Sequence, residues 1–198
     1  MSTTTQRPVA RVDRSVAHDV CAAFLSASSA PKHPTVMAAY RELERQSDEV
    51  FRVLSSGDGA VHVVFSHCPA PYESDEEMIA AVRAEHLLEV TTAASDRERT
   101  HPLLGCELGG PYDRFRAVHD IVGHVIPRFG FDRDGEFAAW RAQERLHRGP
   151  ARWALATELH AEHSVRWTTG SLCDHKATLL DGKLLQRARR GVCTSAPA

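Results

Sequence analysis

Residues Phe115 to Val125 read FRAVHDIVGHV, and this stretch decides how the centre of the chain folds. Its apolar side chains recur at helical spacing, which predicts a helix with one buried face: Phe115, Val118, Val122 and Val125. The two histidines of the stretch, His119 and His124, are five positions apart. On an uninterrupted α-helix they would point about 140° away from each other. We therefore expect the helix to stop near Gly123, so that a turn brings both imidazoles together.

A carboxylate follows the two histidines in the segment Ala156-Thr157-Glu158-Leu159-His160. Two imidazoles and one carboxylate make a metal site that leaves coordination positions open, and this donor set is typical of non-haem Fe(II). The sequence thus predicts His119, His124 and Glu158 as metal ligands.

Three further side chains are candidates for catalytic roles around such an ion: Glu136, Glu162 and His160. Residues of this kind orient the ligating histidines or receive protons. For Glu162 the structural alternative is an ion pair with Arg166, which lies four residues further along the same helix face.

Length and composition limit the classes of protein to which this chain can belong. The chain has 198 residues and a formal net charge of −2, with no basic stripe of the kind that binds nucleic acid. It contains no apolar run of membrane-spanning length, and its start lacks the apolar core of a signal peptide. Five cysteines occur singly, which favours reduced thiols over disulfides. We expect a cytoplasmic protein that binds neither nucleic acid nor membrane, with small-molecule partners; the oligomeric state stays open.

The pattern along the chain predicts an α+β fold, mainly α, with a small sheet of short strands. We expect a disordered N-terminus over residues 1–14 and a single catalytic domain over 15–198, with its metal-binding core at about 112–168. Strands are expected at 61–65 and 87–90. Helices are expected at 15–26, 35–54, 74–86 with Ser74 as N-cap, 112–123, 134–147, 150–168 and 174–190.

Other metal classes compete with the mononuclear iron site. A di-iron carboxylate protein would use two Glu-x-x-His pairs, and the chain has one, Glu144 with His147. Glu136 with His160 and His163 is a further set of donors for a second ion. A zinc-dependent hydrolase uses the same donors with a bound water. A non-enzymatic helical binding protein, in which the histidines only cap helices, is the remaining alternative.

The motifs resemble the metal-binding core of the pterin-dependent aromatic amino acid hydroxylases. The similarity runs from His119-Asp120-x-x-Gly123-His124-Val125 through Phe137-Ala138-Ala139-Trp140 to Thr157-Glu158, over about residues 117 to 167. It implies iron bound by His119, His124 and Glu158, and a hydroxylase or monooxygenase acting on a small organic substrate, aromatic or amino-acid-like, with O2. The segments that grip the pterin lie outside this similarity, so the reductant, pterin or another, stays open.

A longer stretch is similar to uncharacterised, often phage-encoded proteins. The shared order is Pro71-Tyr72-x-Ser74, His101-Pro102-Leu103, Phe115-Arg116-Ala117-Val118-His119-Asp120-x-x-Gly123-His124, Gly135-Glu136 and Thr157-Glu158. This resemblance carries no activity, but it implies that Glu136 belongs to the site.

Overall fold

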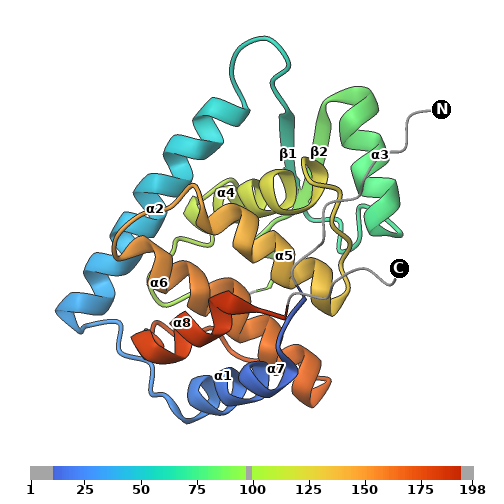
Figure 1. Cartoon of the computed structure of the whole chain (residues 1–198). Helices are drawn as coiled ribbons and strands as arrows, with labels where there is room; N and C mark the ends of the chain where they lie inside the picture. Colours follow the sequence, from blue (N-terminus) through green and yellow to red (C-terminus); the bar gives the residue numbers. More distant parts are fainter. Residues whose placement is uncertain (1–10, 97–99, 193–198) are drawn as a thin grey trace, which may run out of the picture.

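Helices make up most of the structure, a computed structural model that describes residues 11–96 and 100–192 (Figure 1). The prediction of a mainly helical α+β fold with a small sheet is confirmed. In chain order the first half contains α1 (Arg14–Ser26), α2 (Pro34–Leu54), β1 (His62–Ser66), α3 (Asp75–Glu85), β2 (Leu87–Thr91) and a 3-10 turn (Ala93–Ser95). The second half contains α4 (Pro111–Val118), η2 (His119–Val125), α5 (Arg133–Glu144), α6 (Ala151–Leu155), η3 (Ala156–Ala161), α7 (Glu162–Thr169) and α8 (Gly182–Arg190).

The two strands form a parallel pair, in which Val64 lies opposite Glu89. Parallel neighbours need a crossover, and α3 provides it. The side chain of Ser74 accepts a hydrogen bond from the backbone N–H of Glu77, while the Glu77 side chain accepts one from the N–H of Glu73. This reciprocal capping confirms the predicted start of the helix.

Two clusters of buried apolar side chains hold the fold together. The larger one joins α1, α2 and the helices of the C-terminal half, around the fully buried Trp140, Tyr40 and Phe24. The smaller one lies between the sheet, α3 and η2, and includes Met78, Val90 and Ile121. The helix η2 belongs to this smaller cluster through its apolar face, so its opposite face is available for the histidines.

A continuous helical rod made of α6, η3 and α7 runs through the C-terminal half (Figure 1). The expected helix over 150–168 matches it within one residue at each end. Its alanines, including Ala154, Ala156 and Ala161, are fully buried. Small side chains let neighbouring helices approach closely, which explains why this rod lies in the interior.

The helix expected over 174–190 begins only at Gly182. Residues 174–181 are extended because their backbone groups bond to other elements: the Ala177 carbonyl accepts from the N–H of Ala30, and the Thr178 carbonyl accepts from the hydroxyl of Thr157. Asp181 then caps α8 through the N–H groups of its first turn. Tertiary hydrogen bonds outweigh local helix propensity here, and they bring His175 to the helical rod.

Near the N-terminus, residues 1–10 of the segment expected to be disordered lie outside the described residues. The next residues make defined contacts: Arg11 pairs with Val192, the N–H of Val12 donates to Asp134, and Asp13 caps α1. Across the described ranges, the structure contains no helix long and apolar enough to cross a membrane.

Candidate metal centre

A π-helix, not a turn, brings the two histidines together. The chain continues helically from α4 through η2, where hydrogen bonds connect residues five apart: the N–H of Ile126 donates to the carbonyl of Ile121 at 2.9 Å. Residues spaced by five then lie nearly in line. The Nε2 atoms of His119 and His124 are 3.2 Å apart, and both side chains are buried.

The expected helix stop at Gly123 is therefore wrong. The chain reverses later, at Arg128, which has a left-handed backbone with φ of 61°. Gly123 serves close packing instead. A Cβ added there would lie 2.9 Å from the Cβ of Ala139 and 3.3 Å from Nδ1 of His119. The missing side chain lets α5 approach η2 and leaves room for the His119 ring.

Glu136, in the first turn of α5, completes the group. Its Oε2 atom lies 3.4 Å from Nε2 of His119 and 3.5 Å from Nε2 of His124. Donors about 2.1 Å from one ion are separated by about 3.0–3.4 Å in octahedral or tetrahedral geometry. The three donor atoms thus fit a single divalent ion, and these residues form one of the possible metal-binding groups among the described residues.

Hydrogen bonds at the far side of each imidazole orient its metal-facing nitrogen. Nδ1 of His124 donates to the backbone carbonyl of Phe129 at 3.0 Å, and Nδ1 of His119 donates to Oε1 of Gln143 at 3.0 Å. In the neutral ring the proton then resides on Nδ1 and the lone pair on Nε2. Two lone pairs and a carboxylate oxygen face one another, an arrangement that a cation or a shared proton must stabilise.

The ionisation of the group fits a cation site. Burial alone would raise the pKa of Glu136, but its hydrogen bonds with His119 and His124 lower it well below its usual range. Burial lowers the pKa of His124, yet the hydrogen bond and charge of Glu136 outweigh burial and leave it raised. His163 adds a third imidazole, with Nδ1 3.2 Å from Oε2 of Glu136, and burial lowers its pKa to about 4. His163 is therefore neutral near pH 7.

Glu158 does not take the position expected for it. It belongs to a different group, with Glu162 and His175. Its Oε1 accepts hydrogen bonds from the hydroxyl of Tyr40 at 2.5 Å and from Nε2 of His101 at 3.1 Å. The residue sits in the second π-helix, η3, whose register directs this carboxylate toward α2. Glu136 replaces it beside His119 and His124.

The two other catalytic candidates have separate surroundings. Glu162 contacts Nδ1 of His175 at 2.8 Å, and burial, followed by the charge of Glu158, raises its pKa to about 7. The alternative ion pair of Glu162 with Arg166 is not among the described contacts; the Arg166 guanidinium lies over the ring of Trp167. His160 stacks on Trp140 with ring centroids 4.3 Å apart. Burial lowers the His160 pKa to about 3, so this ring is neutral and packs as a core side chain.

The sequence pattern of a solvated helix face would leave the Glu-x-x-His pair of the di-iron alternative exposed, and this expectation is wrong: Glu144 and His147 are both buried. Glu144 forms ion pairs with Arg141 and Arg189. His147 bonds to the hydroxyl of Ser47 and to the Gln143 carbonyl. Both side chains thus have protein partners that account for their burial.

A pocket of about 590 Å³ adjoins the centre. Its wall includes His163, which contacts Glu136, and Glu162 and His175 of the second group; Arg116 and Tyr112 contribute from α4. Arg116 also donates to the carbonyl of Thr91 at 2.7 Å, which holds its guanidinium at the wall. A volume of this size suits a small organic ligand.

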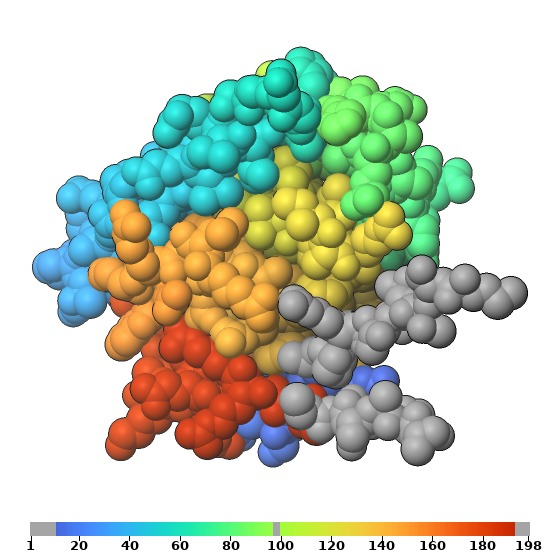
Figure 2. Space-filling model, turned by 45° about the horizontal axis from the view of Figure 1, so that its top comes forward, coloured from blue at the N-terminus to red at the C-terminus, as the bar shows by residue number. Residues whose placement is uncertain are grey.

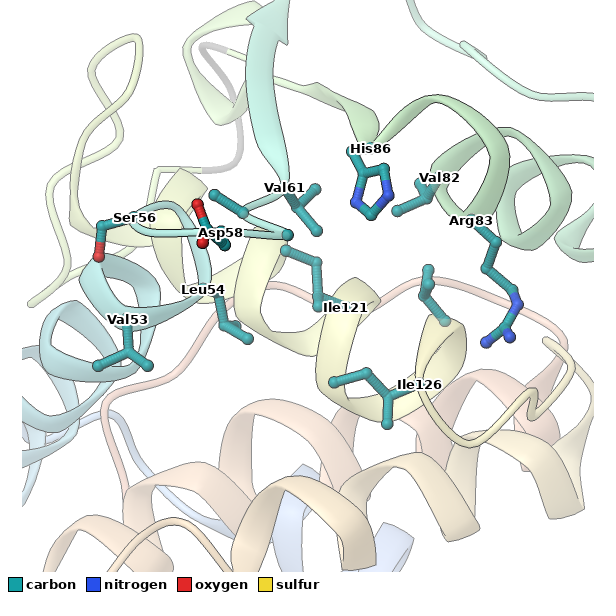
Figure 3. A pocket seen from close by; sticks show the side chains of 13 residues that line it. Val53, Leu54, Ser56, Asp58, Val61, Val82, Arg83, His86, Ile121 and Ile126 are labelled. Carbon is teal, nitrogen blue, oxygen red and sulfur yellow. The ribbon is translucent and has the colours of Figure 1, made fainter.

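Another pocket, of about 370 Å³, lies on the opposite face of η2 (Figure 3). It is lined by the end of α2, the end of α3, Ile121 of η2, and Ile126, which follows η2 directly. In Figure 2 the yellow segment reaches the surface there between cyan α2 and green α3. None of the candidate metal ligands lines this pocket, so we place no chemistry in it.

Comparison of the chain with family models, with curated proteins and with solved structures finds no match. The geometry of the side chains therefore carries the functional argument.

Sequence reasoning missed three residues of these sites: Tyr40, His101, and His175 as a partner of Glu162. The set of Glu136 with His163 was among the donors considered for a second ion, and the two side chains do lie in contact. His101 was present in the order shared with the phage-encoded proteins, but no spacing connected it to Glu158. Tyr40 lies 118 positions from Glu158, a separation over which no local pattern operates.

Proposed function

We propose that this protein is a mononuclear non-haem Fe(II)-dependent oxygenase that holds its iron through His119, His124 and Glu136. The observation that carries the proposal is the triangle of two Nε2 atoms and one carboxylate oxygen with sides of 3.2 to 3.5 Å. Two histidines and one carboxylate with open positions are characteristic of non-haem Fe(II) oxygenases. Bound iron would supply the redox chemistry that activates O2 toward a carbon atom of the substrate.

The protein's own residues set the geometry and the charge of the centre. Gln143 and the Phe129 carbonyl hold the imidazoles, while Glu136 supplies one negative charge. One carboxylate against a divalent cation leaves a net positive charge, which favours an anionic group on the substrate or co-substrate. Burial of all three ligands keeps bulk water away from the ligand atoms.

The substrate we infer is a small organic molecule, aromatic or amino-acid-like, bound in the pocket of about 590 Å³. Arg116 in the pocket wall offers a guanidinium that suits a carboxylate. The partners in this proposal are that substrate, O2 and a reductant, pterin or another small donor. We also place the protein in the cytoplasm, where thiols such as Cys21, Cys68 and Cys106 stay reduced.

A zinc-dependent hydrolase is the second candidate, and one observation favours it. Glu162 lines the pocket with its pKa raised to about 7 by burial and by Glu158, which suits a general base near neutral pH. Zinc accepts the same three ligands. The identity of the metal separates the two candidates.

Metal analysis and oxygen uptake together test the proposal. Protein purified without oxygen and loaded with Fe(II) should consume O2 when aromatic compounds and amino acids are screened with a tetrahydropterin or ascorbate as reductant. His124→Ala should lose the iron of this centre and the uptake, while Glu85→Gln, an exposed change, should keep both. Stoichiometric zinc with hydrolytic activity would replace the oxygenase by the hydrolase, and absence of any bound metal would favour a non-enzymatic binding protein.

A further inference from the structure

A second group of donors lies in the C-terminal half. Glu158 and Glu162 are one helical turn apart on the rod formed by η3 and α7, and His175 comes from the extended segment before α8. One ligand atom of each lies within 4.8 Å of the others. The side chain of Glu158 has no solvent exposure, and those of His175 and Glu162 are exposed by only 7% and 14%.

One side-chain oxygen of Glu158 accepts two hydrogen bonds, and the other accepts none from the protein. Nδ1 of His101 accepts the backbone N–H groups of Leu103 and Leu104, so its proton resides on Nε2 and is donated to Oε1 of Glu158. The Tyr40 hydroxyl donates to the same oxygen. The other oxygen, Oε2, is buried and accepts no hydrogen bond from the protein. A buried carboxylate oxygen without a donor is costly, which marks it as an atom that meets a partner from outside.

The neighbouring carboxylate increases that cost. Glu162 faces Glu158 from the next turn of the rod, and two buried carboxylates in one site repel each other. Each has a neutral or polar partner in the protein, yet the described residues place no Lys or Arg ion pair on either of them. A bound cation would contact both carboxylates at once and would be the largest local charge in the site.

An ion can reach this group from solvent. Glu162 and His175 line the pocket of about 590 Å³. Glu158 does not line it, but one of its carboxylate oxygens lies within 4.8 Å of ligand atoms of these two residues. The same pocket has His163, the neighbour of Glu136, in its wall. The second group therefore opens onto the cavity that adjoins the first centre.

We propose that Glu158, Glu162 and His175 form a second site, which binds a divalent first-row cation such as Mn2+, Fe2+ or Zn2+. Two carboxylates and one imidazole suit these ions better than Ca2+ or Mg2+, which prefer oxygen donors alone. Tyr40 and His101 hold Glu158 in place through its first oxygen, as outer partners do for ligating carboxylates. The site is independent of the first centre, because the two groups share no ligand.

Equilibrium dialysis of the full chain against Zn2+ alone tests this site. Zinc is redox-inert, so binding is measured without any turnover. The wild type should retain two equivalents, Glu162→Gln one and Glu136→Gln one. The double variant Glu136→Gln with Glu162→Gln should retain none. Any zinc that it does retain measures binding to surface histidines, which is subtracted from the other values. His175→Gln removes a ligand of the second site from a different segment of the chain, and it should also retain one equivalent of zinc.

Each site fails separately in this experiment. If Glu162→Gln and His175→Gln both keep two equivalents, the second site is wrong while the first stands. If Glu136→Gln keeps two equivalents, the first centre is wrong and the second is untouched. Glutamine has the shape of glutamate, and far-ultraviolet circular dichroism verifies that each variant keeps its helices. If Glu162→Gln loses them, His175→Gln replaces it; if Glu136→Gln loses them, His124→Ala replaces it.

Discussion

Nε2 of His119 lies 3.2 Å from Nε2 of His124, although the two residues are five positions apart in one continuous helix. The π-helical hydrogen bonds of η2 produce this proximity, since they widen each turn beyond the α-helical period. A short π-helical insertion inside an α-helix is uncommon and frequently coincides with a functional site. Here it converts a spacing that would separate two imidazoles into a pair of metal-facing nitrogens.

The identity of the carboxylate ligand gives the first prediction. Glu136→Gln should lower the affinity of the first centre for Fe(II) by more than about 100-fold, beyond the effect typical of an outer partner. Glu158→Gln should leave that affinity within a few fold, because its carboxylate contacts Tyr40 and His101 instead. Anaerobic Fe(II) titration measures both. The reverse pattern would restore Glu158 as the ligand and remove Glu136.

Gln143 supports the centre from outside. Gln143→Met keeps the volume but removes the acceptor for Nδ1 of His119, so the ring loses its fixed tautomer and orientation. Metal affinity should fall by about 10–100-fold without loss of the site. Gln46→Met, another buried glutamine that bonds to Arg148 on a different surface, is the matched control and should leave affinity unchanged. Equal affinities for both variants would show that the hydrogen bond to His119 does not matter.

Close packing at Gly123 makes a stability prediction. In Gly123→Ala the new Cβ would lie 2.9 Å from Ala139, so η2 and α5 must separate. We expect a loss of about 1–3 kcal/mol of unfolding free energy, the usual cost of overpacking. Gly182→Ala is the control, since its Cβ would meet Trp153 at an ordinary 3.5 Å. Urea unfolding of the two variants compares them, and similar midpoints would argue against the tight contact.

His147 makes a prediction about pH. Burial lowers its pKa below the ordinary 6.5. In the unfolded chain this histidine takes up a proton as the pH falls through about 6.5, while the folded form resists it, so acidification favours unfolding. The loss is at most about 1.4 kcal/mol per pH unit for one group. His147→Gln should therefore lose less stability than the wild type between about pH 7.5 and about pH 5. Parallel stability curves would mean that His147 does not titrate on unfolding.

Local patterns predicted the elements but not the partners in the sites. Ser74 and Glu77 marked the start of α3 because capping depends on residues three apart, and the long rod of α6, η3 and α7 followed from its apolar period. The change from α- to π-helix in η2 was not predicted, because the local spacing of residues does not distinguish a π-helical segment from a turn. Spacing suggested a turn, which is the other way to bring His119 and His124 together.

The choice between Glu136 and Glu158 depended on tertiary structure. Both carboxylates lie on helices that follow the histidines, and each belongs to a motif that resembles known sequences. The structure separates them through contacts that join distant parts of the chain: α5 packs on η2 and brings in Glu136, whereas Tyr40 of α2 and His101 bind Glu158. Neither contact can be predicted from the local spacing of residues in the sequence.

Anomalous diffraction from crystals grown with Fe(II) under anaerobic conditions tests the central claim most directly. Data collected above and below the iron absorption edge locate the ion without reference to activity. We predict a peak bounded by Nε2 of His119, Nε2 of His124 and Oε2 of Glu136. A peak that joins the two histidines to Glu158, or iron-loaded crystals with no peak at His119 and His124, would contradict the assignment.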